Sequence, residues 1–171
     1  MFDEILDENG QPREHYKNYA DWLKSCPAGH LDSRMLEADL MFRRIGITFA
    51  VYGEGENTER LIPSDPVPRI ISASEWEFLE KGLEQRVTAL NMFLHDVYHD
   101  GKIFKDGIIP AEKIYKNAQF QPCMMGLDLP KQIYSHISGV DIIRNSDGNY
   151  YVLEDNLRVP SGVSYMLQNR R

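Results

Sequence analysis

The segment from Val140 to Arg158 constrains the fold of this 171-residue chain more than any other part of it. Val140–Arg144 and Tyr150–Asn156 are rich in β-branched and aromatic residues, which favour strands. Residues 145–149 between them, with the sequence NSDGN, are typical of a turn. The segment is therefore expected to form a β-hairpin.

The register of this hairpin decides which side chains share a face. If Asp147 and Gly148 form a two-residue type I′ turn, counting outward places Asp141 opposite Glu154. Glu154 and Asn156 then point to the same side, because successive strand residues alternate faces. Opposed carboxylates repel, and a divalent cation would remove the repulsion. These oxygen ligands predict a Mg²⁺ site. One alternative is a solvated acidic face that binds no metal. Another is a longer turn, which would change the pairing and place Asp141 elsewhere.

The composition limits the classes of function that fit the chain. Its length suits one ordinary domain, and its 42% hydrophobic and 26% charged residues are normal for a globular protein. The net charge of −7 argues against binding to nucleic acid or to an anionic membrane surface. No apolar run is long enough for a transmembrane helix, and Cys26 and Cys123 do not indicate a disulfide framework. The expected compartment is the cytoplasm.

The clearest helical pattern extends from Glu75 to about Tyr98. Ser74 and Glu77 form a capping-box pattern, which predicts Ser74 as the N-cap. Apolar residues recur at helical spacing along the whole segment, and they are expected to face the core. These are Trp76, Leu79, Leu83, Val87, Leu90, Phe93, Leu94 and Val97.

The other patterns predict a helical lead-in, residues 1–42, followed by an α/β core, residues 43–171, that contains the hairpin 140–156. The expected shorter elements are helices over Tyr16–Ser25, Asp32–Phe42 and Pro110–Tyr115, and a strand over Gly46–Tyr52. Met35, Leu36, Leu40 and Met41 of the second helix are expected to face a core, and Gly53–Asn57 is expected to form a polar loop. The fold class is therefore α+β (mixed α/β), with a mixed or antiparallel sheet and one long packed helix.

The run Val152–Tyr165, VLEDNLRVPSGVSY, resembles the circularly permuted ATP-grasp family, in particular the glutathionylspermidine synthetase-like ligase domain. The likeness extends upstream through Gly46–Phe49, Pro68–Ile71, the pairs Gln85-Arg86 and Asp106-Gly107, and the triplet Ala89–Asn91. The resemblance implies that residues 1–171 are a single partial domain, the N-terminal portion of such a protein. The nucleotide-binding lysines of the family lie downstream of this hairpin.

The resemblance also implies an ATP- and Mg²⁺-dependent carboxylate–amine ligase that acts through an acyl phosphate. In the family, an acid on one strand and a Glu-x-Asn pair on the next hold Mg²⁺, and the matching positions are Asp141, Glu154 and Asn156. The implied partners are ATP, a small-molecule or peptide carboxylate and an amine acceptor. No GxxxxGK[ST] loop replaces the missing lysines, so this portion is expected to be inactive alone. It is expected to bind its missing C-terminal half or to self-associate.

Two arginines are candidates for contacts with phosphate. Arg158 lies two residues beyond Asn156 and shares its face if the strand continues, where a guanidinium would stabilise a transferring phosphoryl group. The alternative for Arg158 is a partner that neutralises Glu154. Arg69 is flanked by Pro68 and Ile70, and it is a candidate for phosphate or substrate binding, with a structural ion pair as its alternative.

Ser161, Gly162 and Ser164 lie where a loop leads into the final helical pattern. Free N–H groups and the positive end of the helix dipole bind anions at such a place, so these residues are candidates for phosphate binding. Ordinary N-capping by Ser161 is the alternative.

Other constellations are weaker. His95 and His99 are four residues apart on the long helix, as in a zinc hydrolase, but Asp96 stands where the HExxH pattern requires glutamate. Ser135 precedes His136, and no GxSxG elbow accompanies them. A rival of a different class is a non-catalytic folding or interaction module with a solvated acidic hairpin.

Overall fold

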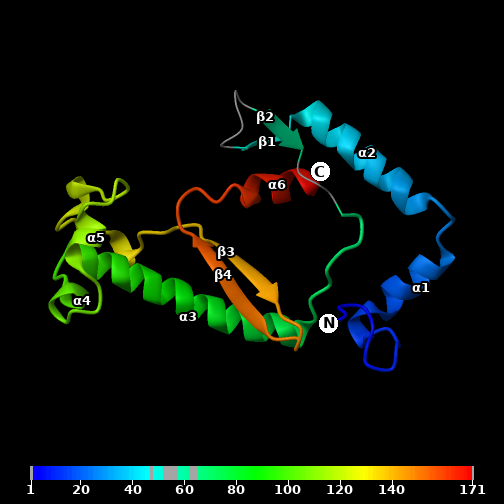
Figure 1. The fold of residues 1–171 in the computed structure, drawn as a ribbon, viewed down its shortest axis with the longest axis horizontal. Helices are drawn as coiled ribbons and strands as arrows, with labels where there is room; N and C mark the ends of the chain where they lie inside the picture. The colour runs from blue at the N-terminus through cyan, green and yellow to red at the C-terminus, as the bar shows by residue number, and fades with distance from the viewer. Residues whose placement is uncertain (1, 47, 52–57, 62–64, 171) are drawn as a thin grey trace. The chain divides into compact units, whose positions relative to one another are not determined.

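The computed structural model describes residues 2–46, 48–51, 58–61 and 65–170. The chain separates into two compact units, residues 1–72 with 165–171, and residues 73–164 (Figure 1). Within the described ranges it combines helices with two antiparallel two-stranded sheets, β1–β2 and β3–β4. The predicted α+β fold class is thus confirmed.

The first unit begins with a helical segment. Its elements are a 3₁₀ turn at Glu14–Tyr16, α1 at Lys17–Ser25, α2 at His30–Ile45, β1 at Thr48–Val51 and β2 at Thr58–Leu61. The two predicted helices and the first strand are present, whereas β2 was not anticipated. The predicted polar loop at residues 53–57 lies outside the described residues. Helix α2 ends at Gly46, whose φ of +74° is a left-handed conformation that glycine adopts without strain.

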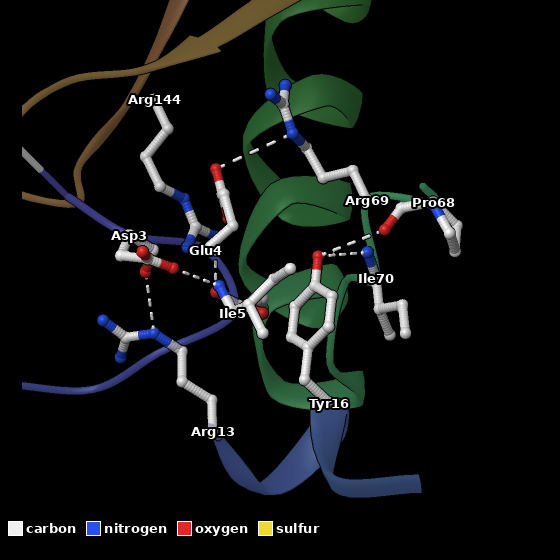
Figure 2. A network of polar contacts seen from close by, with 10 residues as sticks. Asp3, Glu4, Ile5, Arg13, Tyr16, Pro68, Arg69, Ile70 and Arg144 are labelled. Atoms are coloured by element: carbon white, nitrogen blue, oxygen red, sulfur yellow. Dashed lines mark hydrogen bonds and ion pairs between the residues drawn. The ribbon is translucent and has the colours of Figure 1, made fainter. Parts of the chain in front are cut away.

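Among the described side chains of this unit, Tyr16 is the best buried, with 1% of its surface exposed. Its hydroxyl accepts a hydrogen bond from the Ile70 N–H at 2.7 Å and donates to the Pro68 carbonyl oxygen at 3.5 Å (Figure 2). Tyr16 therefore fastens the extended segment around Pro68–Ile70 to the start of α1.

The expected core-facing side of α2 is wrong. Met35, Leu36, Leu40 and Met41 are 40–62% exposed, and Phe42 is buried instead at 5%. Periodicity identified a helix here, but these four apolar side chains stay largely exposed in the described part of the chain.

The second unit is built on one long helix. Its elements are α3 at Ala73–Tyr98, α4 at Lys102–Lys105, α5 at Ala111–Tyr115, 3₁₀ turns at Pro122–Met124 and Pro130–Gln132, β3 at Gly139–Arg144 and β4 at Tyr150–Asn156. Helix α6, Gly162–Asn169, begins at the end of this unit. In Figure 1 the β3–β4 hairpin runs along α3.

The long helix departs from its prediction at the N-terminal end. It begins at Ala73, so Ser74 lies in the first turn and is not the N-cap. Trp76, assigned to the core, is 51% exposed, whereas Leu79 and Val97 are buried at 5% and 2%. The other residues of the predicted stripe are half-buried.

Asn91 on α3 positions the segment that leads into β3. Its Oδ1 accepts hydrogen bonds from the N–H groups of Tyr134 at 2.7 Å and Ser135 at 3.0 Å. The buried Ser135 hydroxyl in turn contacts the Ser138 hydroxyl at 2.9 Å and donates to the Leu157 carbonyl oxygen at 3.2 Å. These bonds hold the start of β3 against the end of β4. Ser135 is therefore a structural residue in the described structure.

Candidate metal and phosphate site

The predicted pairing of Asp141 with Glu154 is confirmed, but the turn that was expected to produce it is wrong. Near the turn, Arg144 pairs with Tyr150, which is one residue off the expected register. The Asn145 N–H bonds to the Asn149 carbonyl oxygen at 2.9 Å, so the connection is longer than a two-residue type I′ turn.

A β-bulge restores the expected register further along the hairpin. Ile142 pairs with Val152, and the next pair is Asp141 with Glu154, so Leu153 is an extra residue in β4. A longer turn and a bulge each shift the register by one residue, and the two shifts cancel. The predicted neighbours are therefore correct for a reason that the sequence did not reveal.

The three predicted magnesium ligands lie on one face of the hairpin. Asp141, Glu154 and Asn156 are all exposed. The Asn156 Nδ2 donates a hydrogen bond to the Glu154 Oε1 at 3.1 Å, and Asp141 is the cross-strand neighbour of Glu154. Two carboxylates and an amide oxygen are the hard donors that Mg²⁺ takes, with remaining positions left for water and phosphate. The residues present fit such an ion.

The opposite face of the hairpin is held to α3 by two ion pairs. The Arg144 Nη2 lies 2.5 Å from the Glu75 Oε1, and the Arg144 side chain is 6% exposed. Arg86 binds Asp155 through both carboxylate oxygens, with Nε–Oδ1, Nε–Oδ2 and Nη2–Oδ2 distances of 2.8, 3.0 and 2.6 Å. These hydrogen bonds from Arg86 hold the pKa of the Asp155 carboxyl below its ordinary value.

Sequence reasoning missed both ion pairs, and the one between Arg86 and Asp155 shows why. Gln85-Arg86 was part of the family resemblance, but its partner Asp155 is 69 positions away along the chain. The signal available in the sequence was an acid between two predicted ligands, which alternation places on the opposite face.

Gly139 is a second residue that the prediction missed. A Cβ at this position would lie 2.8 Å from the Pro160 Cβ and 3.5 Å from the Asn156 Cβ. The chain after β4 therefore folds closely over Gly139. This approach places the turn at Ser161–Ser164 at the same end of the hairpin as the three candidate metal ligands.

Of the candidate phosphate-binding residues, the backbone hydrogen bonds fix the turn at Ser161–Ser164, whereas the strand does not extend to Arg158. Strand β4 ends at Asn156, so the alternation of faces does not extend to Arg158, which is exposed. Ser161 accepts two hydrogen bonds through its carbonyl oxygen, from the Ser164 N–H at 3.1 Å and the Ser164 hydroxyl at 2.9 Å. A Cβ at Gly162 would have no atom within 4 Å, so this turn is open on that side.

Arg69 belongs to the first unit, where it makes the structural ion pair that was its alternative. Its Nε lies 3.7 Å from the Glu4 Oε1, and the Arg69 side chain is 69% exposed (Figure 2). An exposed pair at this distance is weak, because water screens the charges. The guanidinium thus remains accessible to an anionic ligand.

The histidine pair on α3 does not support a zinc site. The rings of His95 and His99 stack with centroids 4.1 Å apart, and the His95 Nδ1 lies 3.3 Å from the Tyr134 hydroxyl. The Asp96 carboxylate accepts the N–H groups of Lys102 and Ile103, both at 2.9 Å, which caps α4. Across the described part of the chain, no group of three or more His, Cys, Asp and Glu side chains could hold a metal ion.

An apolar groove of about 910 Å³ lies between α3 and the hairpin. Its apolar walls include Phe78 and Leu83 of α3 and Ile142 and Val152 of the strands. Phe78 is 68% exposed. A two-stranded sheet on one helix leaves much of its apolar surface uncovered.

The sequence profile described as a circularly permuted ATP-grasp matches residues 68–171, which contain α3, the hairpin and the Ser161–Ser164 turn. The chain belongs to the circularly permuted ATP-grasp family. Among the residues that the structure describes, no helix has the length and apolar content needed to cross a membrane.

Several relatives match almost the entire chain, and three of them illustrate the range. It is 43% identical to an uncharacterized protein of Synechocystis sp. over 100% of its length and 36% of the relative. It is 45% identical to an uncharacterized protein of Mycobacterium leprae, over 99% of the chain and 30% of the relative. A Frankia casuarinae protein provisionally named glutamate–cysteine ligase 2-2 is 38% identical, over 99% of the chain and 19% of the relative. The chain thus spans about a third or less of the length of these relatives.

Proposed function

We propose that this chain is the N-terminal part of an ATP- and Mg²⁺-dependent carboxylate–amine ligase of the glutathionylspermidine synthetase-like type. The observation that carries the proposal is the placement of Asp141, Glu154 and Asn156 on one exposed face in a chain of the ATP-grasp family. The name of the Frankia relative is also that of a ligase. The two cysteines are unpaired, which agrees with a cytoplasmic location.

In this proposal, Asp141, Glu154 and Asn156 hold Mg²⁺, which neutralises the charge of the ATP phosphates when bound. A substrate carboxylate oxygen attacks the γ-phosphorus, and the bond to ADP breaks. An amine then attacks the acyl phosphate, and inorganic phosphate leaves. Arg158 stabilises the charge on the transferring phosphoryl group.

The remaining candidate residues bind the anionic groups of the reactants. The turn that contains Ser161, Gly162 and Ser164 contacts phosphate at the start of α6, through backbone N–H groups other than that of Ser164, which bonds to the Ser161 carbonyl oxygen. Arg69 binds phosphate or the substrate carboxylate once a ligand replaces Glu4 as its partner. The lysines that complete the nucleotide site lie outside these 171 residues. The isolated chain is accordingly inactive.

Paramagnetic Mn²⁺, a substitute for Mg²⁺, provides the direct test of the metal site. Titration into ¹⁵N-labelled chain is expected to broaden the amide signals of Asp141, Glu154 and Asn156 first. Glu154→Gln removes one charged ligand and is expected to raise the midpoint of broadening at least about tenfold. Glu80→Gln, an exposed acid on α3, is the matched control and is expected to leave the midpoint unchanged.

ATP turnover supplies the second half of this test. ADP release is expected from the longer Synechocystis relative when carboxylate and amine substrates are supplied, and not from the 171-residue chain. Broadening spread evenly over all surface acids would contradict the metal site. It would favour the rival interpretation, a non-catalytic module with a solvated acidic hairpin.

We further propose that the groove beside Phe78 is covered in the longer relatives by the part of the polypeptide that this chain lacks. Its apolar walls and the exposed Phe78 support this proposal, because uncovered apolar patches of this kind drive association. The isolated chain is therefore expected to self-associate through the same groove.

Light scattering coupled to gel filtration tests this association at micromolar concentrations. The isolated chain is expected to run as a dimer or larger species, and Phe78→Ser is expected to shift it toward the 19.8 kDa monomer. Glu80→Ser, on the same helix but outside the groove, is expected to have no effect. A monodisperse monomer before any substitution would rule out self-association.

A further inference from the structure

The bulge at Leu153 reverses which residues of β4 face the helix. Before the bulge, Tyr150 and Val152 are half-buried on the α3 side of the hairpin. Uninterrupted alternation would place Glu154 on that same side. With the extra residue, Glu154 is exposed and Asp155 is half-buried against α3 instead.

Without the bulge, the register would place the candidate metal ligands on opposite faces of the hairpin. If the pairing of Ile142 with Val152 continued unchanged, Asp141 would pair with Leu153, and Glu154 would turn toward the helix. A slip of one residue moves every later side chain to the opposite face. Asp141 would then be left without its two partners.

Arg86 distinguishes between these two registers. It makes three hydrogen bonds to Asp155, at 2.6–3.0 Å, and they exist only when Asp155 faces α3. Bidentate arginine–carboxylate pairs are geometrically specific as well as strong. The Asp155 side chain is 15% exposed, so the contact is partly shielded from water.

A second ion pair to α3 holds the turn end of the hairpin, so the register there does not depend on the contact between Arg86 and Asp155. Arg144, on the turn side of the bulge, binds Glu75, while Asp155, on the far side, binds Arg86. The two anchors on α3 are about 16 Å apart along the helix axis, since both lie in one continuous helix. The bulge is therefore enclosed between two fixed points.

From this arrangement we infer that Arg86 is a positioning residue for the metal site. By pairing with Asp155 it holds the bulge at Leu153, and the bulge keeps Glu154 and Asn156 on the face of Asp141. This inference rests on the proposed function only in taking the face with Asp141, Glu154 and Asn156 to be a metal site. The effect on the register itself can be measured without any metal.

The test replaces Arg86 with methionine, which keeps an unbranched stem but removes the bidentate hydrogen bonds. Nuclear Overhauser contacts across the hairpin are expected to change from Asp141–Glu154 to Asp141–Leu153, or to a mixture of the two. The Mn²⁺ concentration at half-broadening is expected to rise at least about tenfold. Lys81→Met, an exposed cation on the same helix, is the matched control and is expected to change neither quantity.

Asp155→Asn provides a second, milder variant because it keeps the shape of the side chain and weakens the same contact. It is expected to shift the register in the same direction, and it decides the question if the methionine variant fails to fold. Retention of the Asp141–Glu154 contacts in both folded variants would overturn the inference. If the unsubstituted chain shows no site-specific Mn²⁺ broadening while the register still shifts, the metal proposal fails and the role of Arg86 in the register stands.

Discussion

Replacement of Tyr16 by alanine is expected to lower the free energy of unfolding of the first unit by about 3–5 kcal/mol, the usual cost of truncating a buried aromatic side chain. Tyr16 is 1% exposed, and its ring lies 6.5 Å from that of Tyr19. The change also leaves the Ile70 N–H without its acceptor. A loss of this size is a large part of the stability of a small unit.

The two tryptophans of the chain allow each unit to be followed separately. Trp22 lies in the first unit, 5.3 Å from Tyr19 between ring centroids, and Trp76 lies on α3. In a Trp76→Phe background, urea unfolding monitored by fluorescence reports on Trp22 alone. The midpoint is expected to fall sharply in Tyr16→Ala.

Tyr16→Phe is the matched control, because it removes the hydroxyl and keeps the ring. Its cost is expected to be about 1–2 kcal/mol, because the partly buried Ile70 N–H is left without its acceptor. Equal losses for the alanine and phenylalanine variants would show that packing of the ring contributes nothing. A negligible loss for both would contradict the role of Tyr16 in the core.

Replacement of Asn91 by leucine is expected to destabilise the second unit by about 2–4 kcal/mol, because two backbone donors lose their acceptor. Both N–H groups belong to the segment that carries the chain from α3 to the hairpin, at Tyr134 and Ser135. Leucine preserves the approximate shape of the side chain. The loss therefore reports on hydrogen bonding rather than on a cavity.

Amide hydrogen exchange resolves this effect by residue. Protection of the Tyr134 and Ser135 amides is expected to fall much more than protection in the middle of α3. Asn91→Asp keeps the oxygen acceptor for both amides but replaces the bond from Nδ2 to the Val87 carbonyl oxygen with a contact between two acceptors. It is therefore expected to retain more of this protection than the leucine variant. An equal loss in the aspartate and leucine variants would refute the acceptor role of Asn91.

The hairpin shows how much of the candidate site could be predicted from the sequence. Its strands were predictable because β-rich runs flank NSDGN, and Asp141 does face Glu154. The actual turn and the bulge at Leu153 were not predictable, because a one-residue shift in either changes no local pattern. The longer turn or the bulge alone would have made the predicted pairing of Asp141 with Glu154 wrong, but the two shifts cancel.

The residues that support the candidate site were harder to predict than its candidate ligands. Glu154 and Asn156 form a local pattern that can be compared with a family motif. Arg86 and Asp155 are distant in sequence, and only the packing of the hairpin on α3 brings them together. The close approach of Pro160 to Gly139 is likewise a long-range contact that leaves no periodic signal.

The apolar stripes were predicted as helices correctly and as buried surfaces only in part. Helix α2 and the N-terminal end of α3 have the expected spacing, but Leu36 and Trp76 are 62% and 51% exposed. Spacing determines which residues share a face. It does not supply a neighbouring element to cover that face.

The sequence by itself determined most of the helices and strands, two candidate oxygen ligands two positions apart on β4, and membership of a recognisable family. Local preferences of backbone and turn residues are sufficient for all of these. Only the tertiary structure decided which carboxylate of the Glu154–Asp155 pair faces α3 and which faces solvent. The reason is that both choices satisfy the local strand geometry, and Arg86 on a distant helix distinguishes between them.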